Sequence, residues 1–354
     1  MKRLIWLLLA ACVLCVPVRA SELPPEAEAA LPEELLSAAQ RQGTLSGATD
    51  YLWTQLQSGL DGYRSEALRG AAELMLVSLL CAGAEGLGGA LAPEARRVIP
   101  CVGVLAVTAL SGGRLRAFIG LGAQTVEQLA AMAKLLLPAL AAAVAAGGFA
   151  ATASAWQMAT LFACELLTDA MRSVLLPLTY CYIGMAAAGA ILPESGLEQL
   201  AEGLRKGITW ALCAAVGGFT AYLSLSNVLA GSADRTALKA ARLAISGTVP
   251  VVGGLLSDAA ESVLSGAQAL RGSIGVLGIC AILSVALSPL VRLGAHYVLY
   301  QLAAFVSGAV GTKEVQKLLQ ALSGAFALVL GMTAACALML VVALLIAATM
   351  VVMT

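Results

Sequence analysis

Three charged residues lie close together inside an otherwise apolar part of the sequence, and they are the first candidates for chemistry. Glu165, Asp169 and Arg172 are spaced i, i+4 and i+7, which places them on one face of a helix. Charges inside apolar segments are costly, so they are candidate functional residues. The cluster could line a polar pathway or carry a protonation site. The favoured interpretation is structural: a surface turn, or a salt bridge that locks two helices, in which Asp169 and Arg172 compensate each other.

A second candidate pair is Arg292 and His296, spaced i, i+4 after Pro289 in an apolar segment. His296 is the only histidine in the chain. A lone histidine in a membrane could shuttle protons, but an interfacial or hydrogen-bonded role is favoured. The sequence contains neither G-x-S-x-G nor H-E-x-x-H, and no other metal-type ligand is near His296. The expectation is therefore a protein that is not an enzyme, with no catalytic residue, metal or cofactor.

The elements that carry these residues are membrane-spanning helices. Hydrophobic residues make up 60% of the 354 positions and charged residues 12%, and the mean hydropathy is +0.90. A soluble domain carries about a quarter charged residues. Long runs contain no charge at all: 135–164, 173–193, 207–233, 272–291 and 318–354. A helix needs roughly 20 apolar residues to cross a bilayer. The zero net charge and the lack of a basic block argue against nucleic acid.

The predicted fold is all-α, a polytopic helical membrane protein with about seven spans. Residues 1–20 are predicted to be a signal peptide cleaved before Ser21, because Lys2 and Arg3 precede a short apolar stretch that ends in small residues. Residues 21–70 are predicted to be a short extracytoplasmic segment, and 71–354 the helical membrane domain. The predicted apolar segments are 71–92, 98–122, 127–150, 156–192, 207–231, 245–270, 272–306 and 320–353, of which 156–192 should be bent or discontinuous.

The prolines suggest an internal repeat. Pro138 and Pro250 are 112 residues apart, and so are Pro177 and Pro289. Residues 127–231 and 245–353 would then each contain three apolar segments. Seven of the nine cysteines occur singly in apolar runs, and they are expected to be small buried hydrophobic residues rather than disulfide partners or metal ligands.

Residues 232–270 combine a basic stripe, a break and two acids. Arg235, Lys239 and Arg242 are spaced i, i+4 and i+7, a pattern typical of cytoplasmic headgroups. The Gly- and Pro-containing stretch that follows could be a re-entrant loop or a helix flat on the membrane. Because Asp258 and Glu261 oppose a full crossing, the favoured count is seven spans with Thr354 in the cytoplasm. On that count, Arg96 and Arg97 are on the same side as the basic stripe.

The same region resembles the stage III sporulation protein AE family of endospore-forming bacteria. The resemblance is carried by Arg235-Thr236 with Lys239 and Arg242, by Val249-Pro250-Val251-Val252-Gly253, and by Ser257-Asp258-Ala259 with Glu261. It implies a subunit of a membrane channel or secretion complex between mother cell and forespore that is required for forespore development. The implied location is the mother-cell membrane around the forespore. The implied partners are the other subunits of the stage III complex, a forespore protein and the lipid bilayer.

A self-sufficient secondary transporter is the alternative, since broken helices and ion pairs near mid-membrane are typical of that class.

Overall fold

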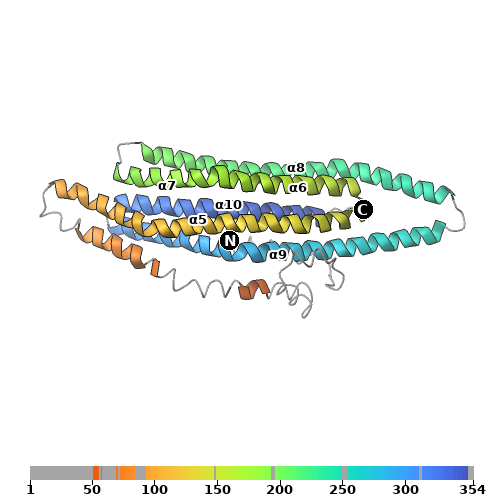
Figure 1. Cartoon of the computed structure of the whole chain (residues 1–354), viewed down its shortest axis with the longest axis horizontal. Helices are drawn as coiled ribbons and strands as arrows, with labels where there is room; N and C mark the ends of the chain where they lie inside the picture. Colours follow the sequence, from red (N-terminus) through yellow and green to blue (C-terminus); the bar gives the residue numbers. More distant parts are fainter. Residues whose placement is uncertain are drawn as a thin grey trace.

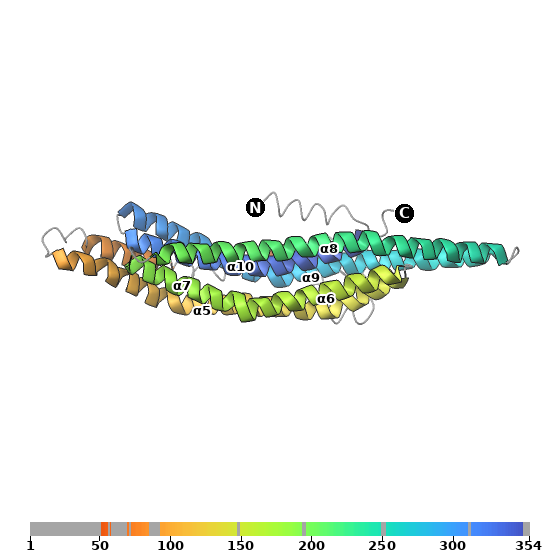
Figure 2. The same cartoon turned by 90° about the horizontal axis from the view of Figure 1, so that it is seen from above.

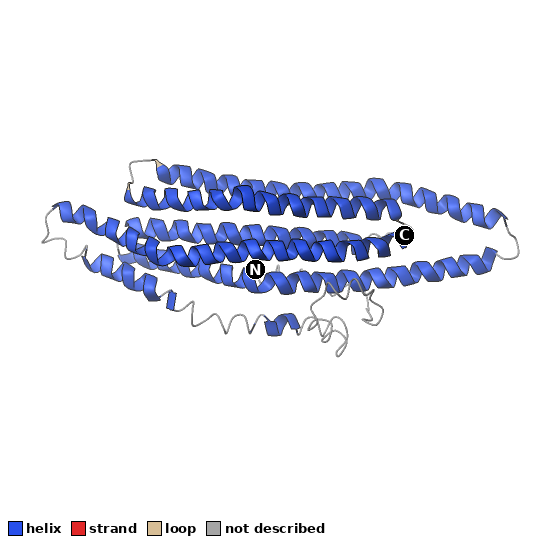
Figure 3. Cartoon of the chain, viewed as in Figure 1, coloured by secondary structure: helices blue, strands red, loops and turns tan. Residues whose placement is uncertain are grey.

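The structure is a computed structural model that describes residues 51–55, 57, 69–70, 72–84, 93–146, 149–192, 196–248, 253–310 and 313–349. These residues form helices joined by short turns, as Figure 3 shows, and no strand occurs among them. The all-α prediction is therefore confirmed for the described part of the chain. The predicted signal peptide, and most of the predicted extracytoplasmic segment, lie outside it.

The long elements follow one another in antiparallel order along one axis (Figure 1). They are α5 (Pro93–Ala146), α6 (Ala150–Ala170), the π-helical segment η3 (Met171–Leu175), α7 (Leu176–Ile191), α8 (Leu197–Thr248), α9 (Gly253–Val310) and α10 (Lys313–Thr349). A shorter apolar helix covers Ala72–Ala84. The turn between α7 and α8 contains Gly196, whose φ of 68° lies in the left-handed region that favours glycine.

The described residues contain five helices long and apolar enough to cross a membrane, rather than the seven predicted spans. Two of the predicted spans, 98–122 and 127–150, belong to the single helix α5. Of a third, 71–92, the structure describes residues 72–84, which form the short helix Ala72–Ala84. The polar residues between 122 and 128 were interpreted as a loop, but the helix continues through them. The apolar part of α5 is 49 residues long, about 74 Å at 1.5 Å per residue, so these helices exceed the thickness of one bilayer.

Two predicted spans form the single helix α5, and this reverses the direction expected for every later helix. Arg96 and Arg97 are at the start of α5, whereas the basic stripe is near the end of α8, two helical reversals later. These positions lie at opposite ends of the bundle (Figure 1). The prediction that they share a side is therefore wrong.

The segment 245–270 is helical in both of its described parts. Residues 245–248 complete α8, and residues 253–270 form the first part of the 58-residue helix α9. Figures 1 and 2 show both helices running past the ends of α5, α6 and α10. Residues 249–252 lie outside the described residues, so the predicted flat helix or re-entrant loop stays a prediction. The predicted repeat units are built differently here: 127–150 and 156–192 belong to two antiparallel elements, whereas 253–270 and 272–306 share one.

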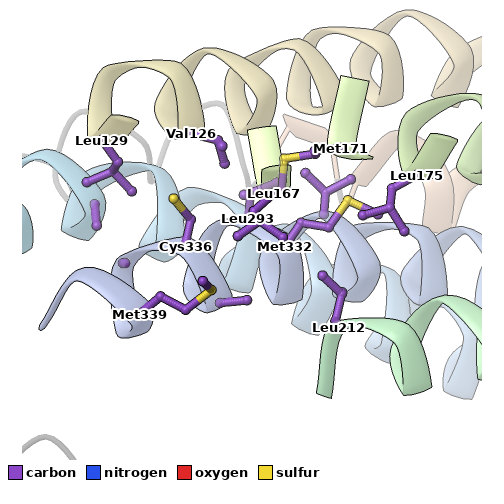
Figure 4. Close-up of a cluster of buried hydrophobic side chains, with 14 of the residues drawn as sticks. Val126, Leu129, Leu167, Met171, Leu175, Leu212, Leu293, Met332, Cys336 and Met339 are labelled. Carbon is purple, nitrogen blue, oxygen red and sulfur yellow. The ribbon is translucent and has the colours of Figure 1, made fainter. Parts of the chain in front are cut away.

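The core is built around α10, which packs against α9, α5, α8 and α7. Leucine, methionine and alanine side chains from these helices interdigitate, and Figure 4 shows one such cluster around Met332, Cys336 and Met339 of α10. Two hydrogen bonds tie other helices to the α10 backbone. Trp156 Nε1 donates to the carbonyl of Ala343 at 3.0 Å, and the Tyr182 hydroxyl donates to the carbonyl of Ala321 at 2.9 Å.

Candidate functional site

The predicted cluster of Glu165, Asp169 and Arg172 lies where α6 passes into η3. It is at the middle of Ala150–Ile191, a continuous apolar stretch of 42 residues. All three residues are exposed on the surface of the bundle. The segment 156–192, predicted to be bent, tilted or discontinuous, is bent: the helix runs on without a gap, but the π-helical segment interrupts its α-helical pattern.

The break in this helix has an identifiable cause. Pro177 occupies the first turn of α7, where it offers no N–H and its ring crowds the carbonyl four residues earlier. That carbonyl belongs to Ser173 in η3, and the π-helical turn accommodates the lost bond. The Ser173 hydroxyl bonds back to the Asp169 carbonyl. Figure 2 shows α6 and α7 forming a bowed arc beside the straighter α8.

The partners of these charges come from α5, not from within the cluster. The Arg172 guanidinium forms an ion pair with Glu127, and Lys134 Nζ lies 2.7 Å from Glu165 Oε1. The expectation that Asp169 compensates Arg172 is therefore wrong as to the partner. The Asp169 carboxylate makes no ion pair among the described residues. The cluster does lock two helices together, in agreement with the structural interpretation.

Sequence reasoning missed Glu127 and Lys134, although a signal for them existed. Lys134 follows Glu127 by seven residues, and Arg172 follows Glu165 by seven. Residues seven apart lie on the same helix face. Because α5 and α6 are antiparallel neighbours, the first residue of one pair falls opposite the second of the other. The charges at those positions are opposite in sign in both cases.

All four paired side chains remain substantially exposed. Their relative exposures are 57% for Arg172, 42% for Glu127, 56% for Lys134 and 61% for Glu165. The ion pairs therefore sit on the outside of the bundle rather than in its core.

Arg292 and His296 do not join this group. Both are on α9, where Arg292 is exposed and His296 is only 5% exposed. The imidazole packs against Phe118 with ring centroids 3.8 Å apart, and it also neighbours Phe326 and Tyr300. Its Nδ1 lies 3.2 Å from the Arg292 carbonyl. The structure thus places His296 in an aromatic environment with a polar contact to the backbone.

The residues that carry the family resemblance lie toward the end of α8 and the start of α9. Arg235, Lys239 and Arg242 are near the end of α8, and Gly253, Asp258 and Glu261 are near the start of α9. Pro250 lies outside the described residues. The end of α8 and the start of α9 both lie at one end of the molecule, beyond α5, α6 and α10 (Figure 1).

No group of histidine, cysteine or carboxylate side chains suited to a metal ion occurs among the described residues. Of the seven described cysteines, only some are buried. Cys164, Cys280 and Cys336 are buried, whereas Cys181 and Cys213 are exposed on the bundle surface. The prediction of buried cysteines is wrong for these two.

Five apolar helices in an antiparallel bundle, with ion pairs on an outer face, place the chain among multi-span helical membrane proteins. The family model of stage III sporulation protein AE matches residues 34–351, and the chain belongs to this family. Among curated proteins, stage III sporulation protein AE of Bacillus subtilis (strain 168) is 23% identical over 205 residues. That match covers 58% of this chain and 51%, about half, of the relative. No solved structure matches the chain.

Proposed function

We propose that this chain is a membrane subunit of the sporulation channel or secretion complex between mother cell and forespore, and that it is required for forespore development. The observation that carries the proposal is the family match over residues 34–351. Five candidate membrane-spanning helices are compatible with a membrane subunit. In this proposal the protein resides in the mother-cell membrane around the forespore and catalyses no reaction.

The proposed partners are the other subunits of the stage III complex and a forespore protein. The part of the chain best placed to meet a partner outside the bilayer is the end of α8 and the start of α9, since both helices carry charged residues there, beyond the charge-free runs 207–233 and 272–291. Positions of both charge signs lie there, which suits a polar protein contact.

Gene deletion in the sporulating host tests the proposal. We expect engulfed forespores that fail to develop, and restored spore counts when the gene is returned. A fusion to a fluorescent protein should label the membrane around the forespore. Normal spore counts after deletion, or label spread evenly over all membranes, would overturn it.

One observation favours the secondary-transporter alternative. The interrupted helix α6–η3–α7 carries charged residues at its midpoint, which is the construction that many transporters use near the bilayer centre. Reconstitution separates the two candidates. Solute flux by the purified chain alone in liposomes would favour the transporter, whereas no flux without the companion subunits would favour the complex.

A further inference from the structure

We infer that one face of the bundle looks onto water inside the membrane, not onto lipid. This mid-span face consists of exposed or half-exposed residues from two antiparallel elements. They are Glu127, Gln128, Ala131 and Lys134 of α5, with Glu165, Asp169, Arg172 and Ser173 of α6 and η3.

The charged residues lie between exposed apolar residues along α6 and α7. On α6, the exposed Met158 and Phe162 precede the charges, and on α7 the exposed Tyr180 follows them. From Met158 to Tyr180 the helix rises about 33 Å, close to the roughly 30 Å of a bilayer's hydrocarbon core. Glu165 and Arg172 lie near the centre of that interval, so the charges are bracketed by apolar surface on both sides. A bilayer centred on this interval places the charges at mid-depth.

The second argument concerns solvation. Within each ion pair, the two charged groups satisfy one another only in part. Each of the four side chains keeps between 42% and 61% of its surface exposed. The exposed carboxylate of Asp169 has no ion-pair partner among the described residues. Hydrocarbon offers no hydrogen bonds to these groups, and charged residues inside membranes face protein or a water-filled cavity. The ion-pair partners are already within this chain, so the remaining need is for water.

The third argument concerns the backbone. Arg172 belongs to the π-helical segment Met171–Leu175, and single π-helical turns inside α-helices are frequent at functional sites. The irregular backbone lies at the same level as the ion pairs. Irregular helices at membrane depth are tolerated where neighbouring groups or water satisfy the freed backbone atoms. Backbone and side chains therefore point to the same conclusion independently.

Cysteine accessibility tests the inference in the full-length chain. In a cysteine-free variant, Gln128→Cys, Ala131→Cys and Ser173→Cys are introduced one at a time, and native membranes are treated with charged, membrane-impermeant thiosulfonates. Only the thiolate reacts, and it forms in water but not in lipid, so we expect labelling at least about tenfold faster than at a lipid-facing position. Ser173→Cys is nearly isosteric, and three positions guard against one that disturbs the fold.

The chain supplies its own control. Cys213 is exposed on α8 within a run of 27 residues, 207–233, that contains no charge, and it is restored as the only cysteine in a fourth variant. Rates at all three positions no faster than at Cys213 would overturn the inference. Oxidative cross-linking of Ala131→Cys between chains, without labelling, would also overturn it by showing that protein covers the face.

The inference deepens the proposed function and rests on it for its biological meaning, but the two can fail separately. Labelling in membranes reports the surface alone, whereas spore counts report the role. Fast labelling with normal sporulation of the deletion strain would retain the water-facing surface and reject the sporulation role. Slow labelling with blocked sporulation would do the reverse.

Discussion

The helical pair α6–α7 and its neighbour α8 have similar burial but opposite chemistry at the same level. Only 28% of the apolar window of α6–α7 and 22% of that of α8 is buried inside the bundle. Yet α6 and η3 carry Glu165, Asp169 and Arg172 at mid-length, whereas α8 is free of charge from 207 to 233. Exposure therefore does not identify the solvent. The type of residue exposed at a given depth is the better guide, and the exposed surface of α8 at this level suits lipid.

The two helices can be compared because their levels correspond. Ala214 is 17 residues into α8, and Arg172 is 19 residues before the end of α7 at the other side of the same turn. At 1.5 Å per residue these positions differ in height by about 3 Å. The exposed side chains near that level on α8 include Trp210 and Tyr222, which suit lipid.

The comparison of α6–α7 with α8 requires that the two run antiparallel across the same membrane. The first prediction therefore concerns topology, and its outcome is yes or no. Paired reporters, green fluorescent protein and alkaline phosphatase, inserted just before Pro93 and between α7 and α8 should report the same side of the membrane. A reporter inserted between α8 and α9 should report the other side, because three antiparallel elements (α5, the run α6–α7, and α8) separate it from the start of α5. If the first two insertions report opposite sides, then 98–122 and 127–150 are two separate spans rather than one helix.

The helical class and its membrane character could be predicted from the sequence because charge-free runs are a local signal. The number of spans could not be predicted. Glu127 and its polar neighbours interrupt an apolar run, which suggests a break between two spans unless the ion pair of Glu127 with Arg172 is known. The same long-range pairing explains the site. Spacing placed Glu165, Asp169 and Arg172 on one face, but the partner of Arg172 depends on how α5 packs against η3. Likewise, spacing grouped Arg292 with His296, whose ring turns toward Phe118 in the core.

The largest graded effect is expected from a charge placed on each surface. Ala214→Lys on α8 would expose an ammonium group to lipid, which costs about 2.5–3.5 kcal/mol at a helix centre on insertion scales. Ala131→Lys on the mid-span face would meet water and should cost under about 1 kcal/mol, as for an exposed charge. The fraction of chain integrated into membranes measures both. Equal losses for the two variants would remove the distinction between the surfaces.

A smaller effect is expected from added methyl groups, which probe packing rather than solvent. A Cβ on Gly122 of α5 would collide with Val329 of α10, whereas a Cβ on Gly217 of α8 meets nothing within 4 Å. Gly122→Ala should therefore destabilise the protein by about 1–3 kcal/mol, the usual cost of overpacking. Gly217→Ala should be neutral, or stabilising by up to about 1 kcal/mol through helix propensity. Thermal unfolding in detergent compares them, and a neutral Gly122→Ala would contradict the close approach of α5 and α10.

The smallest effect is expected from the ion pair between Arg172 and Glu127. The size of its coupling energy distinguishes a surface in water from a surface in lipid. Arg172→Gln, Glu127→Gln and the double variant form a double-mutant cycle in detergent-solubilised protein. For a half-exposed pair in contact with water the coupling should be about 0.2–1 kcal/mol. The cycle with Asp169→Asn should be additive within about 0.3–0.5 kcal/mol, because Arg172 pairs with Glu127 instead. A stronger coupling to Asp169 than to Glu127 would contradict this pairing. Single-variant losses of about 2.5 kcal/mol or more, the cost of a lone charge in lipid, would contradict the aqueous surface.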